Sequence, residues 1–250
     1  MPWVGPRFVL EKGYKFTKKD MKNSTILSKF LIIIFISITI IFAYLIKNLI
    51  DNNQTKSLVM QIKKINSAIE GFSQKYHALP GDIQNTMSFG ISIYNSDGNG
   101  DNYITDSRKL IDMAEGEIVN FWMHLSNSQM LYEKYDGFEN EMARTSSTFP
   151  ESKIGNAGIV AFSNAGKTYL QIGFSHADTN RLFTKNNTLT TKEAFSYDKK
   201  VDDENPYKGN VVVAGGEVLN YTQNSICARG EAYDINNSNP SCQLRIEIKE

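Results

Sequence analysis

A polar segment with oxygen-bearing side chains at alternate positions is the strongest candidate for chemistry in this sequence. It reads NSDGNGDNYITD, and it places Asp97, Asn99 and Asp101 two residues apart, with the carbonyl of Tyr103 next in the series. Alternating oxygen ligands of this kind form the first half of an EF-hand calcium loop. The spacing therefore predicts that calcium, the one cofactor the sequence suggests, binds here.

The rest of this segment departs from the EF-hand pattern. The twelfth position holds Arg108 instead of a bidentate glutamate, which excludes a full loop, so Asp106 or Asp112 would have to supply a further ligand. Asn102 occupies the glycine position, which asparagine tolerates because it adopts left-handed backbone geometry. The alternative is a solvated turn without a metal, since Asp, Asn and Gly all favour turns.

A second segment resembles a phosphate-binding loop. AFSNAGKT, from Ala161 to Thr168, ends in Gly-Lys-Thr but begins with alanine instead of the leading glycine. A phosphate loop leads into a helix N-terminus, whereas the residues after Lys167 alternate between apolar and polar, as in a strand. We therefore predict a hairpin turn here and no nucleotide site.

The remaining residue types give little support for catalysis. His77, His124 and His176 are scattered, without a carboxylate or cysteine at ligand spacing, and we expect packing or surface roles for them. There is no serine elbow, no zinc-type cysteine pattern and no glycine-rich dinucleotide turn. The expectation is a protein that is not an enzyme, with an anchored enzyme as the least favoured alternative. The formal net charge of zero excludes a strongly basic nucleic-acid binder.

An uncharged apolar run defines the first structural element. Residues 30–46 read FLIIIFISITIIFAYLI between Lys29 and Lys47. At ~1.5 Å per residue the run is roughly 26 Å long, and the apolar residues that extend it to position 50 bring it to bilayer thickness. We predict a membrane anchor; a buried core helix and a cleaved signal peptide are the alternatives. The anchor residues are Phe30, Leu31, Ile34, Ile38, Ile41 and Leu45.

The charges that flank this run predict its orientation. Seven basic residues precede it, against only Glu11 and Asp20. By the positive-inside rule, residues 1–29 stay in the cytoplasm and the rest of the chain is exported. Cys227 and Cys242 are an even pair in the exported part, so they are expected to form a disulfide, two free thiols being the alternative.

The helix is predicted to continue beyond the membrane. Apolar residues recur at spacings of four and three over 51–79, which gives an amphipathic helix with one buried stripe. Pro80 and Gly81 then end the helix in a turn, and Asp82 is placed to cap the segment that follows. The stripe that packs on the head consists of Leu58, Ile62, Ile65, Ile69, Phe72 and Tyr76.

The remaining residues, 80–250, are expected to form one globular head. A second helix is predicted from Ala114 to Leu125 and a short one over 191–200. Alternating or continuous apolar runs predict strands at 158–162, 168–174, 210–219 and 244–248. A long helix followed by mostly consecutive strands indicates an α+β fold in which an antiparallel sheet receives the apolar stripe.

The order of these segments resembles that of type IV pilin-like proteins, including the pseudopilins of type II secretion. The resemblance covers about residues 30–216. It begins with the apolar helix, INSAIEGFSQKYHALPGD and DGNGDNYI, and continues with EIVNFWMHLSNSQML, ESKIGNAGI and the stretch from LTTKEAFSYDKKVDD to NPYKGNVVVAGG. It implies an anchored prepilin-type protein with a pilin-like head, in which the helices of neighbouring subunits bundle. Related heads use calcium to fix loops.

One part of the pattern is absent at the N-terminal junction. Prepilins are usually cleaved after a glycine directly before the apolar run, and the fifth mature residue is usually glutamate. Here Lys29 precedes the run, the fifth residue is Ile34, and the nearest upstream glycine is Gly13. A glutamate in lipid needs a partner, so its absence removes a device that aligns subunits.

The sequence therefore predicts one of two functions. The first is a non-catalytic subunit of a type IV pilus or type II secretion system, with the membrane and other pilin-like or assembly proteins as partners. It would be a single-pass protein of the bacterial inner membrane, with the head in the periplasm or outside the cell. The alternative is a solitary anchored binding module that uses a pilin-like fold without polymerising, which the missing glycine and glutamate favour.

Overall fold

The computed structural model describes residues 18–91, 96–105, 115–138, 146–155, 157–175, 188–214 and 227–249. The chain divides into two compact units, Met1–Ile50 and Asp51–Glu250. The division falls at the residue where the predicted anchor ends.

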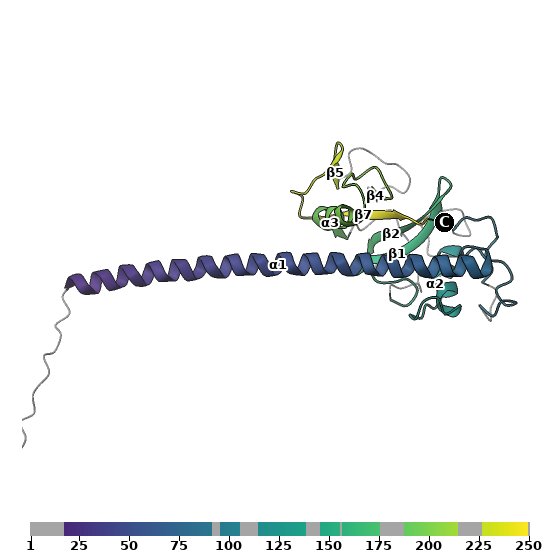
Figure 1. The fold of residues 1–250 in the computed structure, drawn as a ribbon, viewed down its shortest axis with the longest axis horizontal. Coiled ribbons are helices and arrows are strands. Elements are labelled where there is room, and N and C mark those ends of the chain that lie inside the picture. Colours follow the sequence, from purple (N-terminus) through teal and green to yellow (C-terminus); the bar gives the residue numbers. More distant parts are fainter. Residues whose placement is uncertain are drawn as a thin grey trace, which may run out of the picture. The chain divides into compact units, whose positions relative to one another are not determined.

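Helix α1, Lys18–Tyr76, is the first element of the chain (Figure 1). It is the one helix among the described residues that is long and apolar enough to cross a membrane. The six predicted anchor residues are exposed, from 39% at Ile34 to 61% at Phe30. Continuous exposed apolar surface of this kind marks a segment that contacts lipid or protein.

In the second unit, α1 contributes one face to the core. Leu58, Ile62, Ile65, Ile69 and Phe72 are each at most 3% exposed, and they belong to the same apolar core as the inward residues of the sheet. Tyr76 is half-buried, with its ring 4.6 Å from that of Phe72.

Helix α1 ends three residues earlier than the sequence indicated, at Tyr76 instead of Leu79. The N–H of His77 still donates to the carbonyl of Ser73, but His77 itself has φ +55°. A left-handed residue cannot continue a right-handed helix, so the chain leaves the helix before it reaches Pro80.

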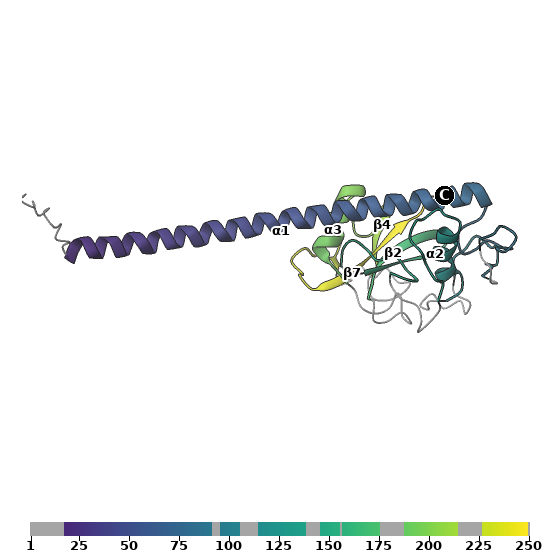
Figure 2. The same ribbon diagram turned by 90° about the horizontal axis from the view of Figure 1, so that it is seen from below.

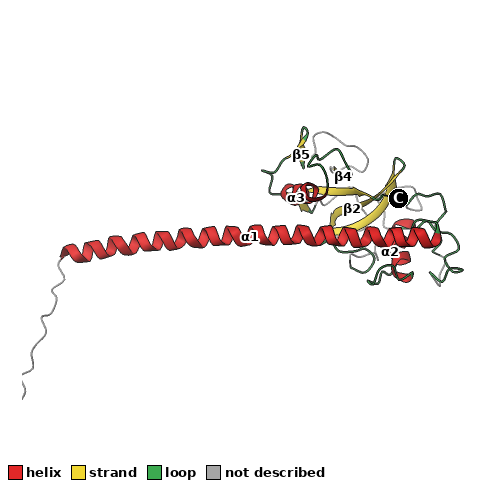
Figure 3. Ribbon diagram, in the orientation of Figure 1, coloured by secondary structure: helices red, strands yellow, loops and turns green. Residues whose placement is uncertain are grey.

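The second unit is an α+β fold around an antiparallel sheet (Figure 3). The sheet has the order β1-β2-β7-β3, and β4 also pairs with β7. Two short strands, β5 and β6, form a separate hairpin. The strands are β1 Ala157–Asn164, β2 Lys167–Ser175, β3 Leu189–Thr190, β4 Val211–Ala214, β5 Ala228–Arg229, β6 Ala232–Tyr233 and β7 Pro240–Glu247; the helices are α2 Glu117–Asn127 and α3 Thr191–Val201.

The segment that resembles a phosphate loop is the turn between β1 and β2. Ala165 and Gly166 both have positive φ, 50° and 80°. Two central residues with positive φ are the signature of the tight turn that matches the twist of a β-hairpin.

Loops bond to the outward backbone of β1 and β4. Along β1, Ala157 and Ile159 bond to the segment 150–152, and the N–H of Ser163 donates to the carbonyl of Ile104. Along β4, the N–H of Val213 donates to the carbonyl of Pro206 and that of Val211 to the carboxylate of Asp202. Such coverage blunts edges that would otherwise pair with other chains.

Several boundaries differ from those read from the sequence. Helix α2 starts at Glu117 instead of Ala114, and β7 starts at Pro240 instead of Leu244. In the segment 210–219, β4 covers Val211–Ala214, and residues 215–219 lie outside the described part. The strands β3, β5 and β6 have only two residues each, too few for a periodic pattern.

A disulfide joins Cys227, at the start of the β5–β6 hairpin, to Cys242 in β7. It ties the short hairpin to the sheet. Both half-cystines are fully buried.

Candidate functional site

The candidate site begins at the turn that follows α1. Gly81 has φ +89°, and a Cβ atom built on it would lie 2.6 Å from the carbonyl oxygen of Glu117. Glycine is therefore required here both for the backbone angle and for the close approach of α2. The abrupt Pro-Gly sequence lets the chain reverse directly against the first turn of α2.

His124 fixes this turn from α2. The imidazole is fully buried, and its Nδ1 accepts a hydrogen bond of 2.9 Å from the N–H of Gly81. Since Nδ1 accepts, Nε2 carries the proton and donates to the carbonyl of Ser96 at 3.0 Å. Burial lowers the pKa of His124 to about 4, although the Ser96 hydrogen bond and Asp97 act in the opposite direction.

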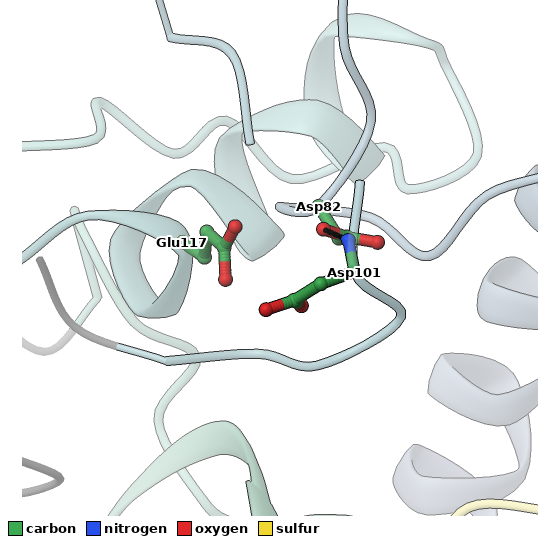
Figure 4. A group of neighbouring side chains, drawn as sticks. All are labelled: Asp82, Asp101 and Glu117. Atoms are coloured by element: carbon green, nitrogen blue, oxygen red, sulfur yellow. Dashed lines mark hydrogen bonds between the residues drawn. The ribbon is translucent and has the colours of Figure 1, made fainter. Parts of the chain in front are cut away.

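Three carboxyl groups meet beside this turn (Figure 4). Asp82 comes from the turn, Asp101 from the loop 96–105 and Glu117 from the first residue of α2. One oxygen of each lies within 4.8 Å of the others. We call Asp82, Asp101 and Glu117 the acidic cluster; Asp82 and Glu117 are buried and Asp101 is exposed.

The two buried carboxylates of the acidic cluster organise the loop 96–105. Asp82 accepts the N–H groups of Gly100, Asp101 and Asn102, at 2.7 to 3.0 Å. Glu117 accepts the N–H groups of Asn99 and Thr105, at 2.9 and 3.1 Å. The loop therefore wraps its backbone donors around two anions that other elements supply.

Burial raises the pKa of both anions despite these bonds. For Asp82 and for Glu117, desolvation is the largest cause, and neighbouring carboxylates add to it; the backbone hydrogen bonds act in the opposite direction. Carboxylate oxygens held this close together are also the ligands that calcium prefers. The cluster can thus anchor the loop by itself and bind a hard cation at its exposed side, where Asp101 lies.

The residues that the sequence predicted as calcium ligands do not all point to one site in the structure. Asp101 belongs to the acidic cluster, whereas Asp97 turns to Thr86 and accepts its N–H at 2.8 Å and its hydroxyl at 2.6 Å. These two bonds lower the pKa of Asp97. The side-chain amide of Asn99 donates to the carboxylate of Asp101 and accepts the backbone N–H of Asp101.

Two further predicted ligands remain. Tyr103 is exposed and donates its N–H to Asp101, and Asp106 lies outside the described residues. Asn102 has φ +65°, the left-handed geometry that the glycine-like position requires. The calcium site stays a prediction. Of its predicted ligands, Asp101 lies beside Asp82 and Glu117, so the acidic cluster is the candidate position for the ion.

A second acidic group lies at the C-terminal end of α3. Asp198, Asp202 and Asp203 have carboxylate oxygens within 4.8 Å of one another. Asp198 accepts the hydroxyl of Tyr233, and burial raises its pKa to about 6. Asp202 accepts the N–H groups that begin β4, so this group also organises a loop.

Sequence reasoning missed the roles of Asp82 and Glu117 in the candidate site. Asp82 was expected to cap the segment after it, but its carboxylate bonds to a loop eighteen to twenty residues away. Glu117 was not singled out, and His124 was assigned to packing or surface. A glutamate at the first position of a helix is a visible signal, but spacing alone does not reveal which loop it meets. Of the other histidines, His77 is exposed and His176 lies outside the described residues.

Comparison with known proteins gives no further support for any of these roles. No family model matches the chain, and neither a curated protein nor a solved structure matches it.

Proposed function

We propose that the chain is a membrane-anchored, non-catalytic subunit with a pilin-like head, which assembles with other pilin-like subunits in a type IV pilus or a type II secretion system. The observation that supports this proposal best is the composition of α1. One helix carries an exposed apolar segment at residues 30–46 and, further along, a stripe that is buried in the head.

The remaining features are consistent with export and assembly. The basic residues before the apolar run favour a cytoplasmic N-terminus. The buried disulfide suits an oxidising compartment, where such bonds persist. The buried polar side chains of the candidate site serve as anchors for loops, a structural use that needs no substrate.

Cross-linking in native membranes tests this proposal. A cysteine at Ile38, in the middle of the apolar segment, should form disulfide-linked dimers with the same position of a second copy. The natural cysteines do not interfere, because they are paired and buried. Matched variants at Ile40 and Ile41 lie on other sides of the helix, so a preferred packing face should give one strong position among the three.

The alternative is a solitary anchored binding module. The specific observation that favours it is the junction, where Lys29 and Ile34 stand in place of the glycine and glutamate usual in prepilins. Absence of cross-links at all three positions, a monomer in detergent and no co-purifying pilin-like protein would together exclude the subunit and support this module.

A further inference from the structure

Helix α3 has one buried and one basic face. Its buried side chains pack against the sheet and the β5–β6 hairpin, and they are Thr191, Ala194, Tyr197 and Asp198. The opposite face carries the exposed Lys192, Lys199 and Lys200, with Ser196 between them. Of the nearby acids, Glu193 is engaged in the capping box with Thr190 at the start of the helix, and Glu204 forms an ion pair of 3.0 Å with Nζ of Lys199. We call Lys192, Ser196, Lys199 and Lys200 the lysine face.

The lysine face points toward the residues of α1 that begin the second unit. Nζ of Lys192 lies 3.2 Å from a carboxylate oxygen of Asp51, and Nζ of Lys200 lies 2.7 Å from the amide oxygen of Asn52. The two lysines are about 12 Å apart along α3, whereas their partners are about 1.5 Å apart along α1. Helix α3 therefore runs across α1, as Figure 2 shows.

Chain connectivity places these contacts near the lipid. Asp51 is bonded directly to Ile50, the last of the apolar residues that extend the segment 30–46 to bilayer thickness. If that segment fills the hydrocarbon core, the headgroup layer begins at its end and extends about 5 to 7 Å further. Asp51 and Asn52 lie within about 3 Å of that end along the helix, so the amines bonded to them lie in the headgroup layer.

We propose that the lysine face of α3 rests on the phospholipid surface from which α1 emerges and donates hydrogen bonds to lipid phosphates. This inference rests on the proposed membrane insertion. Ammonium groups form charge-assisted hydrogen bonds with phosphate oxygens, and a helix that lies in the interface presents lysines in this way. Nζ of Lys199 also lies 5.4 Å from the ring centroid of Phe195, which packs against the core.

Fluorescence quenching in vesicles tests this contact with the full chain. A bimane label is placed on Ser196→Cys, at the centre of the lysine face, and the vesicles contain phosphatidylglycerol and a lipid with a nitroxide on its headgroup. The control is the same label on Ser67→Cys, which is exposed on α1 and lies about 24 Å further along this helix than Asp51. We expect quenching at least threefold stronger at position 196 than at position 67.

A third label separates this inference from the insertion on which it rests. Bimane on Ala43→Cys reports insertion, through quenching by a nitroxide on the acyl chain. Quenching at 43 with equal, weak quenching at 196 and 67 overturns the α3 contact and leaves the anchor intact. No quenching at 43 overturns the anchor itself.

The role of the charges has its own control. In the double variant Lys199→Gln, Lys200→Gln, quenching at position 196 should fall in vesicles that contain phosphatidylglycerol. The matched variant Lys63→Gln, Lys75→Gln removes two exposed lysines from the distal part of α1 and should leave that quenching unchanged. Equal quenching in both double variants would overturn the part assigned to the lysines.

Discussion

At the scale of single residues, the structure explains why the chain turns so sharply after α1. Gly81 lies against the first turn of α2, and its N–H donates to His124. The carboxylate of the next residue, Asp82, accepts backbone N–H groups of the loop 96–105. One turn thus joins three segments of the head. The motif KYHALPGD ends a helix and at the same time supplies the anchor for the candidate site.

Replacing Gly81 by alanine should destabilise the head strongly. The positive φ alone costs about 1 to 2 kcal/mol for a residue with a Cβ, and the contact of 2.6 Å with the Glu117 carbonyl adds a further cost of similar size. Gly90→Ala is the matched control, because Gly90 has φ +68° but open space around it. Thermal unfolding of the full chain in detergent should show a larger loss for Gly81→Ala; equal losses would contradict the steric part.

His124 should make stability depend on pH. Its pKa is lowered from 6.5 to about 4 in the folded chain, so the unfolded chain binds more protons between these values. The contribution to the free energy of unfolding is complete above pH 6.5 and is lost as the pH falls to about 4, roughly 3 kcal/mol in total.

Comparison with His124→Asn isolates this effect from the carboxylates that titrate in the same range. Asparagine keeps an acceptor for the N–H of Gly81 but does not titrate. In urea unfolding, the stability difference between the natural chain and this variant should shrink as the pH is lowered from 7 to 4. A difference that stays constant over this range would show that His124 is not held neutral.

Calcium should raise the melting temperature of the head, and a chelator should lower it. The reason is that a cation bound at the acidic cluster would relieve the repulsion among Asp82, Asp101 and Glu117. Asp101→Asn should abolish the response. Asp136→Asn is the matched control, because Asp136 forms the same type of turn bond, to Phe138, outside the acidic cluster. An identical melting curve of the natural chain with and without chelator would eliminate the site.

At the scale of elements, α1 combines two environments along one helix. Leu58 is fully buried in the core, whereas Met60, two residues later, is 71% exposed. The alternation of spacings by three and four in the sequence is enough to indicate which side of the helix is buried.

This contrast gives a direct test of the stripe. Leu58→Ala should lower the free energy of unfolding by about 2 to 5 kcal/mol, because it leaves a cavity in the core. Met60→Ala removes a side chain of similar size from an exposed position and should change it by less than about 0.5 kcal/mol. Chemical denaturation of the two variants side by side measures the difference; similar losses would mean that the helix does not pack by this face.

How far the sequence predicts the elements depends on whether their signals are local. The apolar periodicity of α1, the alternation in β2 and the turn at Ala165 and Gly166 are local, so these elements could be predicted. Strand β3 forms because β7 offers it backbone partners, and β5 and β6 pair with each other; nothing within two residues indicates either pairing. For the same reason Asp101 could be named as a candidate ligand, whereas its meeting with Glu117 depends on tertiary contacts.

At the scale of the whole molecule, the apolar core of the second unit contains no residue of the first among those that the structure describes. Its apolar core begins at Leu58. A chain that starts at Asp51 should therefore be soluble without detergent and unfold cooperatively. A chain that starts at Asn66 lacks Leu58, Ile62 and Ile65 and should aggregate or melt without a transition. Circular dichroism and size-exclusion chromatography distinguish the two, and aggregation of the longer one would contradict this division.

The loops bonded to β1 and β4 limit the ways in which copies of this protein can join. Since backbone groups along β1 and β4 are engaged within the same molecule, a fibre built from folded copies should not grow by extending the sheet at these two strands. Its subunits must meet through side chains. Such a polymer should dissociate in mild detergent. Unlike amyloid, it should not increase the fluorescence of thioflavin T.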